Sequence, residues 1–440
     1  MLSIDKIREA AQTVENRSLL FLFLITILYV FSKGSIMERD TGSYLHLTII
    51  TTPVYPLFLY GFKKIFGIDG LGPYVLTVQL IYGLYAIWFF IHKIKFHYQC
   101  RAYLTIGFSV ILLVPFWDPG ILVANRIVSE ALAYPTFLIW LGIGLSLLHT
   151  YQGRKLFYFF TVLFILISLR PQFFFILPVL VISLLYALSI RIAKKKIIYT
   201  SLLIVLLLPV ALKLFEKSYH YAMRGEFVST ANTGVQIMAM PFFVADQGDF
   251  DIYKEPLKQN YFKYVYQKAD SARVLQNYYK ASFDDTSYHH LHKNYADLSF
   301  GILSKKGRFF LGKEDSESQR ILIKNNDLLI AMWLPLVLDN FLKFTRIFFQ
   351  NLLNAFDGYI LFFLHVLLLL YYTSQVVIHR KRNTKDSFML ILFLLLFSNA
   401  VLVCLVEHSI DRYFIYTRWI LAFAIITFIQ QVVQKETTSK

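Results

Sequence analysis

The segment Met37–Tyr44 combines acidic, basic and aromatic residues directly after the first apolar run of the chain. Its carboxylates would lie at the boundary between membrane and water, where a charge is costly to bury and commonly has a function. A carboxylate at such a place can accept the proton of an attacking hydroxyl group and so act as a general base. We therefore take Asp40 as the first candidate for a catalytic residue.

Other charged residues are expected at the same depth, because they stand at the ends of later apolar runs. Arginine holds phosphate through bidentate, charge-assisted hydrogen bonds and stays protonated. Acids and arginines gathered at one face of a membrane are what a lipid phosphate carrying a sugar would require, with the phosphate as the anionic leaving group. The residues concerned are Asp40, Arg126, Glu130, Arg170, Glu407, His408, Asp411 and Arg412.

The composition of the chain shows which elements must position these residues. Of its 440 residues 57% are hydrophobic, against about 45–50% in soluble domains, and the excess falls in long apolar runs. The formal charge of +16 comes largely from lysines and arginines in short loops between these runs, which argues against nucleic-acid binding. The fold class we predict is an all-α polytopic membrane protein.

The apolar runs predict about ten membrane-spanning helices. We expect them at residues 18–36, 71–92, 102–117, 127–149, 156–169, 171–190, 197–214, 357–378, 386–406 and 412–432. The basic loops that follow from this count, 93–101, 154–155, 191–196 and 380–385, all fall on the side of the N-terminus. By the positive-inside rule this side is cytoplasmic, as are both termini.

The segments between the spans divide the chain into three expected parts. Residues 1–212 form an N-terminal membrane domain with a first outer loop at 37–70, in which the proline-broken segment 44–67 is expected to lie at the interface as helices. Residues 213–330 are polar and too long for a simple loop, which predicts a small extracytoplasmic module. Residues 331–440 add an amphipathic interfacial helix at 331–356 and the last spans.

Short motifs occur in the predicted outer segments in a recognisable order. Asp40 in the first outer loop is followed by Pro-x-x-Pro-Leu at 53–57, Ser-Glu at 129–130, Leu-Arg-Pro-Gln at 169–172, and Glu-His with Arg-Tyr at 407–413. In this order the chain resembles the GT-C superfamily of polytopic glycosyltransferases, which includes the protein O-mannosyltransferases and the lipid A aminoarabinose transferase. The resemblance covers most of the membrane part and leaves out residues 213–330.

The resemblance implies a polyprenyl-phosphate sugar donor, catalysis at the outer face, and an acid of the first loop as the base, here Asp40. It implies that Arg170 and Arg412 lie near the donor phosphate, and we take Arg126 as a further candidate for binding that phosphate. Several family members carry an Asp-Glu pair in the first loop where this chain has Arg39-Asp40-Thr41, so Glu38 is the rival base. The supporting residues we expect are Glu130, Glu407, His408, Tyr44 and Tyr55.

Each of these residues also has a plainer interpretation. Asp40 could cap a helix that begins before Tyr44. Glu130 could pair with Arg126 one helical turn away, and Arg412 could pair with Glu407 across a tight turn. The run His289-His290-Leu291-His292 offers imidazoles, but without a cysteine or carboxylate spacing it favours a solvated loop over a metal site.

The function predicted from these observations is inverting transfer of a sugar from a polyprenyl-phosphate donor to a lipid-linked or cell-surface glycan, or to a protein. No cofactor is indicated, although a divalent metal would be compatible. The partners are the donor lipid, the acceptor and membrane lipid. The resemblance points to a bacterial cytoplasmic membrane with the active site on the extracytoplasmic side. The alternatives are a transporter or flippase for a lipid-linked oligosaccharide, and an O-antigen-type polymerase.

Overall fold

The computed structural model describes residues 4–150, 152–190, 194–279, 287–378 and 383–438. Within these ranges the regular secondary structure is helical, apart from one isolated parallel bridge between Ile36 and Arg126. The predicted all-α class is therefore confirmed for the described chain. The α-helices are α1 Ile4–Lys33, α2 Thr41–Leu45, α3 Val54–Tyr98, α4 Ala102–Trp117, α5 Glu130–His149, α6 Gly153–Leu169, α7 Ile176–Ser189, α8 Lys195–Arg224, α9 Thr233–Phe243, α10 Pro256–Ser271, α11 Ser287–Ala296, α12 Gly307–Gly312, α13 Gln319–Asp339, α14 Phe341–Ala355, α15 Tyr359–Thr373, α16 Thr384–Val406, α17 Asp411–Phe414 and α18 Trp419–Thr438.

Among the described residues, 8 helical segments are long and apolar enough to cross a membrane. Seven of them coincide with spans expected from the sequence, and two further expected spans are shorter apolar helices, Ala102–Trp117 and Trp419–Gln430. The segment expected at 156–169 is the helix α6, which is not among the 8 candidates. A polytopic helical protein is thus supported, while the exact number of crossings stays a prediction. The 8 candidates are Val14–Lys33, Val54–Tyr98, Glu130–His149, Pro171–Ser189, Lys195–Arg224, Gln319–Asp339, Tyr359–Val377 and Thr384–Val406.

The proline-broken segment of the first outer loop is helical and continues into a long helix. Pro53 precedes α3 and Pro56 lies in its first turn, where a missing N–H costs no helical hydrogen bond. The helix then kinks at Gly67, whose φ of 72° and ψ of 179° lie outside the helical region. Glycine tolerates this conformation because it lacks a Cβ. The expected interfacial helix is therefore the first arm of α3, set at an angle to the main arm.

A second hydrophobic core lies in the segment for which the sequence predicts a module. Its buried residues run from Val235 to Ile347, so this unit begins and ends later than the expected 213–330. The helix α8 continues unbroken past residue 213 to Arg224, with Tyr219 and His220 buried. The apolar helix α13 packs against α9 within this second core, although its composition would also suit a membrane span.

The expected single helix at 331–356 is two helices separated at Asn340. α13 ends at Asp339, and α14 begins at Phe341 and buries one face through Phe344, Ile347 and Asn351. The predicted amphipathic character is confirmed for α14, whereas α13 is an apolar helix of the second core.

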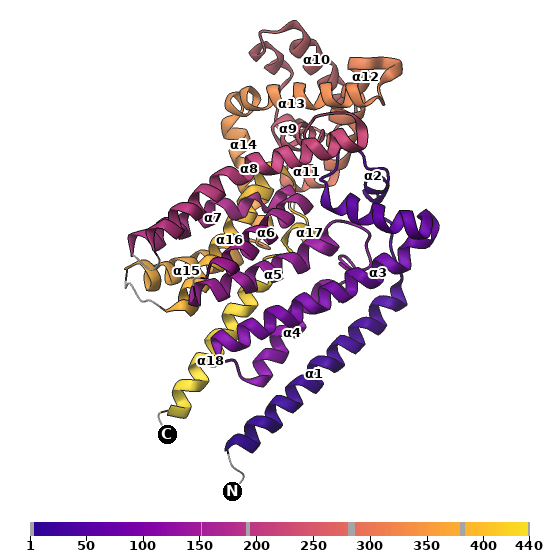
Figure 1. The fold of residues 1–440 in the computed structure, drawn as a ribbon. Helices are drawn as coiled ribbons and strands as arrows, with labels where there is room; N and C mark the ends of the chain where they lie inside the picture. Colours follow the sequence, from indigo (N-terminus) through magenta and orange to yellow (C-terminus); the bar gives the residue numbers. More distant parts are fainter. Residues whose placement is uncertain (1–3, 151, 191–193, 280–286, 379–382, 439–440) are drawn as a thin grey trace.

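The arrangement of the helices separates the two cores along the molecule. The membrane-type helices run side by side, and the helices of the second core, α9 to α13, lie together at one end (Figure 1). The start of α1 and the end of α18 lie at the opposite end (Figure 1). The short helices α2 and α17 begin beside or contain two of the candidate site residues, Asp40 and Arg412.

Candidate functional site

The first outer loop is fixed against the loop that precedes α5. The backbone N–H of Ile36 donates to the carbonyl of Asn125 at 2.8 Å, and that of Ile127 donates back to Ile36 at 2.9 Å. The amide Nδ2 of Asn125 donates to the carbonyls of Val30 and Gly34, each at 2.7 Å. These bonds bring the acidic segment that follows Ile36 to the N-terminal end of α5.

Asp40 occupies the position before α2, but its carboxylate does not cap that helix. Instead Thr41 accepts the backbone N–H of Glu38 and donates to the carbonyl of Ile127, each at 2.8 Å. The Asp40 side chain is 50% exposed, and its Oδ2 lies 3.9 Å from Nη2 of Arg412. The helix-cap interpretation is therefore wrong, and the carboxylate is accessible to an incoming hydroxyl group.

Glu38 and Arg126 form a separate ion pair beside Asp40. The Glu38 carboxylate lies 3.1 Å from Nη1 of Arg126, and both side chains are about a quarter exposed. Gln79 supports the backbone of this loop by donating to the carbonyls of Ala124 at 2.8 Å and Arg126 at 3.3 Å. Tyr55 donates to Gln79 at 2.7 Å, so its contribution is to support this loop.

Glu130 is a buried carboxylate held by two arginines. Its Oε1 lies 2.5 Å from Nη1 of Arg170 and 3.7 Å from Nε of Arg412, and its side chain is 6% exposed. Ser129 bridges the pair, donating to Glu130 and accepting from Arg170, each at 3.4 Å. Glu130 therefore pairs with arginines far along the chain, and the expected pair with Arg126 is replaced by Glu38–Arg126.

Both arginines of this cluster lie against one aromatic ring. The guanidinium carbons of Arg170 and Arg412 each lie 5.4 Å from the ring centroid of Tyr413. The Tyr413 carbonyl accepts from Gln172 at 2.7 Å and from Asn399 at 3.3 Å. Gln172 belongs to the motif at 169–172 that the sequence singles out. Asn399 was not predicted as a site residue, and the one feature that marks it in the sequence is its amide side chain within an otherwise apolar run.

Tyr44 places a neutral hydroxyl group next to these charges. Its ring packs edge-on against Tyr55 with centroids 5.0 Å apart. Burial raises the pKa of Tyr44 to about 12, and the carboxylates of Glu130 and Asp40 raise it as well. The phenol is consequently protonated at neutral pH and can donate or accept a hydrogen bond at the edge of the cluster.

Glu407 and His408 lie on the turn before α17 and face the second core. His408 stacks on Tyr295 with ring centroids 4.1 Å apart and meets His292 edge-on at 4.9 Å. The hydroxyl group of Tyr295 is hydrogen-bonded to Glu407. The expected Arg412–Glu407 pair is not formed, because Arg412 points to Asp40 and Glu130. These two residues dock the second core onto the turn that precedes α17, the helix that carries Arg412.

The histidine run at 289–292 is part of the helix α11, with Leu291 and Tyr295 buried. The segment is therefore a helix and not a loop, although His289 and His292 are exposed. Among the residues that the structure describes, no group of three or more His, Cys, Asp or Glu side chains is arranged to hold a metal ion.

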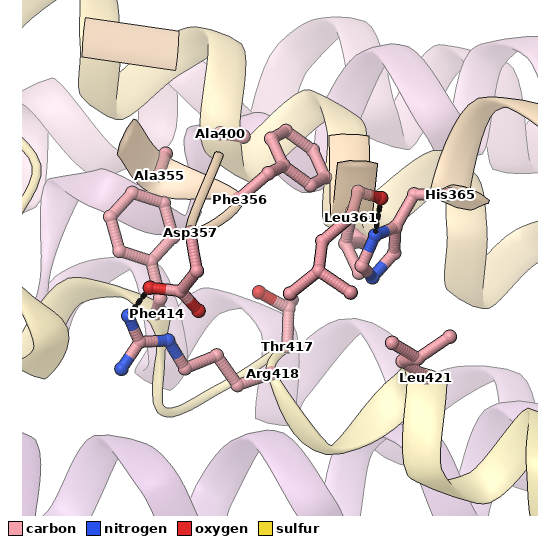
Figure 2. Close-up of a pocket in the computed structure, with 11 residues that line it drawn as sticks. Ala355, Phe356, Asp357, Leu361, His365, Ala400, Phe414, Thr417, Arg418 and Leu421 are labelled. Carbon is pink, nitrogen blue, oxygen red and sulfur yellow. Dashed lines mark hydrogen bonds and ion pairs between the residues drawn. The ribbon is translucent and has the colours of Figure 1, made fainter. Parts of the chain in front are cut away.

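A cavity of about 150 Å³ lies beside α17, apart from the ion cluster. Its lining includes Phe414 and Arg418 but none of Asp40, Glu130 or Arg170. Figure 2 shows its lining residues, with the Asp357–Arg418 ion pair at one edge.

No family model, no curated protein and no solved structure matches this chain. The resemblance drawn from the order of the short motifs therefore stays a prediction.

Proposed function

We propose that this protein is a membrane glycosyltransferase that moves a sugar from a polyprenyl-phosphate donor to a glycan, lipid or protein acceptor. The observation that supports this most is the position of Asp40. Its carboxylate is half exposed, caps no helix, and lies 3.9 Å from Arg412, which also approaches the buried Glu130. A base beside a phosphate-binding arginine is the minimum that such a transfer needs.

The proposed step is a direct displacement. The acceptor hydroxyl group attacks the anomeric carbon and forms the new glycosidic bond, while the bond between that carbon and the donor phosphate oxygen breaks. The proton of the hydroxyl group passes to Asp40, and polyprenyl phosphate leaves as the anion. Attack from the face opposite to the leaving group inverts the anomeric configuration.

The arginines are proposed to have different tasks. Arg170 is buried and lies 2.5 Å from Glu130, so it positions the cluster. Arg412 is about one third exposed, and its closest carboxylate oxygens are 3.7 Å and 3.9 Å away. A phosphate with closer, bidentate geometry can compete for this guanidinium. Arg126 is engaged by Glu38 at 3.1 Å and is proposed to flank the donor site.

We further propose that this site faces the extracytoplasmic side of a bacterial cytoplasmic membrane. The support is the charge distribution of the sequence, in which the basic loops lie on the side of both termini. The start of α1 and the end of α18 lie at the end of the molecule opposite α9 to α13 (Figure 1), whereas the turn just before Arg412 contacts Tyr295 of the second core through Glu407 and His408.

Replacing Asp40 by Asn tests the assignment of the base. Turnover should fall by at least about 100-fold, because general base catalysis contributes roughly 10²–10⁴-fold. The measurement is release of polyprenyl phosphate from a panel of polyprenyl-phosphate hexoses and pentoses in the presence of cell-envelope glycans and lipids. Stability should be nearly unchanged, because an exposed ion pair contributes about 1 kcal/mol or less.

Glu38→Gln is the matched control, since it removes a carboxylate from the same loop. We expect less than about a tenfold loss of turnover, because Glu38 is already engaged by Arg126. If Glu38→Gln abolishes turnover and Asp40→Asn keeps it, the base is Glu38. If both variants keep normal turnover, the proposed mechanism is wrong.

The same preparation separates transfer from transport. A flippase would move the lipid-linked glycan across a vesicle membrane without an acceptor, and it would not release polyprenyl phosphate. A polymerase of the O-antigen type would release a diphosphate-linked carrier instead. The identity of the released lipid therefore decides among these classes.

A further inference from the structure

The cavity beside α17 is apolar in its interior. It is lined by side chains of α14 to α18 and the turns between them, among them Phe356, Leu361, His365, Leu396, Phe414 and Leu421. His365 also lines the space, and its Nδ1 is engaged by the carbonyl of Leu361 at 2.6 Å (Figure 2). An apolar cavity of about 150 Å³ can hold a small hydrocarbon, since engineered cavities of that size bind benzene.

Two charged side chains, Asp357 and Arg418, line one edge of this cavity, and a third, Asp411, pairs with Arg418 from outside the lining. Nη2 of Arg418 lies 3.1 Å from Asp357 and 2.8 Å from Asp411. Both of these ion pairs use Nη2, so the N–H groups of Nε and Nη1 are directed elsewhere. Two carboxylates and one guanidinium give this edge a formal charge of −1, and all three side chains are exposed.

The backbone holds Asp357 in an uncommon conformation at this edge. Its φ is 55°, in the left-handed region, and Gly358 follows with a φ of 106°. For a residue other than glycine such a conformation costs of order 1–3 kcal/mol and persists where the surrounding structure requires it, whereas Gly358 adopts its positive φ freely. Here the turn ends α14 and places the Asp357 carboxylate beside Arg418.

The charged edge lies where two apolar helices begin. Asp357 comes just before the apolar segment Tyr359–Val377, and Arg418 comes just before α18. The neighbouring surface of α15 is apolar and open, with Ile360 80% and Leu367 64% exposed. A cavity beside such a surface is accessible to the hydrocarbon chains of a bilayer.

We propose that this cavity binds a phospholipid with a zwitterionic headgroup that carries a primary ammonium, as in phosphatidylethanolamine. A few methylenes of one chain enter the cavity and the rest of the chain lies along the open apolar surface of α15. The lipid phosphate accepts from the Nε and Nη1 edge of Arg418, and the ammonium donates to Asp357 and Asp411. The charge pattern selects this headgroup. A net anionic lipid meets two carboxylates, and a quaternary ammonium has no N–H to donate.

A lipid bound at this site would also affect the neighbouring ion cluster of Asp40, Glu130, Arg170 and Arg412. Phe414 contacts the cavity, and Arg412, two residues earlier in the same short helix, reaches Asp40 and Glu130. Asp411 and Arg412 are consecutive, so a lipid held by Asp411 fixes the helix that presents Arg412. The proposal itself rests on the cavity and its edge, and it does not depend on sugar transfer.

Native mass spectrometry of the full-length protein in detergent tests the proposal. The probes are dioleoyl phosphatidylethanolamine, phosphatidylglycerol and phosphatidylcholine, titrated separately, with polyprenyl phosphate as a fourth lipid. Phosphatidylethanolamine should bind at least about tenfold more tightly than the other three, which corresponds to one charge-assisted hydrogen bond. Glycerophosphoethanolamine, which has no acyl chain, should not bind at the same concentrations.

Three variants identify the site. Arg418→Gln and Asp357→Asn should each remove the headgroup preference, and Ala400→Leu should weaken binding of all diacyl lipids by filling the cavity that Ala400 lines. Lys343→Gln is the matched control, because it alters an exposed ion pair with Asp246 in the second core. Equal affinity for the phospholipids, or a preference that survives Arg418→Gln and Asp357→Asn, would overturn the proposal. Preferential binding of polyprenyl phosphate would assign the cavity to the donor instead.

Discussion

The helix α17 contributes two consecutive residues to two different ion clusters, and the clusters contrast sharply. Arg412 joins Asp40, Glu130 and Arg170, in which the central carboxylate is 6% exposed. Asp411 joins Arg418 and Asp357, in which both carboxylates are at least 60% exposed. The same chemical groups thus occur once in a buried setting and once in an open one, a few residues apart.

The contrast shows that burial decides how firmly similar ion pairs are held. A charge removed from water is costly unless a partner compensates it. Separating Glu130 from Arg170 would leave both charges buried and unpaired, so this pair is held in place. Exposed ion pairs are worth little, so Arg418 can exchange its carboxylates for another partner at small cost. Asp40 lies between these extremes, attached to the buried cluster by one arginine yet open to solvent. That combination is compatible with the role of base proposed for Asp40.

The largest effect we expect is the loss of the buried carboxylate. Glu130→Gln should destabilise the protein by about 3–5 kcal/mol, because it leaves Arg170 buried without its counter-charge. The measurement is thermal unfolding of the detergent-solubilised protein, followed by tryptophan fluorescence. The double variant Glu130→Gln with Arg170→Gln should recover part of the loss. If Glu130→Gln lowers the free energy of unfolding by less than about 1 kcal/mol, the cluster around Glu130 is hydrated. The difference in burial between this cluster and the one around Arg418 would then have no energetic consequence.

The sequence predicts the long helices well, because an apolar run of sufficient length has few alternatives in a bilayer. It predicts the pairing of charges poorly. The spacing of Arg126 and Glu130 suggests a pair one helical turn apart, yet Arg126 precedes α5 and is turned toward Glu38 by the bridge to Ile36. Which arginine meets Glu130 depends on how α5, α6 and α17 pack, and no local rule encodes that packing.

The second core shows a related limit. The polar segment after 213 indicates a folded unit, but its edges are not evident from composition. α8 continues past 213 to Arg224, and α13 is an apolar helix that belongs to the second core. Hydropathy reports that a helix is apolar and does not report whether lipid or protein covers it. Gly234 marks the contact instead, since its backbone N–H donates to Asn326 of α13 at 2.8 Å and a side chain there would clash.

A smaller effect is expected at Tyr44, which borders the buried cluster. Tyr44→Phe should cost about 1 kcal/mol at pH 8, the typical net contribution of one hydrogen bond. Because burial raises the pKa of Tyr44 to about 12, the unfolded chain loses this proton near pH 10 while the folded protein keeps it. The stabilising contribution of Tyr44 is therefore complete below pH 10 and declines between pH 10 and about 12, by at most about 1.4 kcal/mol per pH unit.

Unfolding of the unaltered protein and of Tyr44→Phe, compared from pH 8 to pH 12, isolates this residue from the other tyrosines. The difference in stability should shrink or change sign above pH 10. A difference that stays constant over this range would place Tyr44 in water, and the edge of the cluster would then be more open than its neighbours indicate.

The smallest effect is expected in the exposed cluster of Arg418, Asp357 and Asp411, and it tests the comparison with the buried cluster most directly. Arg418→Gln should change the unfolding temperature of lipid-free protein by an amount equivalent to about 1 kcal/mol or less, because its partners Asp357 and Asp411 are exposed. Arg418 and Arg170 each have carboxylate partners within about 3 Å, so ion-pair distance alone would rank them together. Burial instead predicts a much larger loss of stability when the ion pair of Arg170 is broken than when that of Arg418 is broken. If Arg418→Gln proves as destabilising as Glu130→Gln, distance rather than desolvation governs both clusters, and Arg418 is not free to exchange its partners for a lipid.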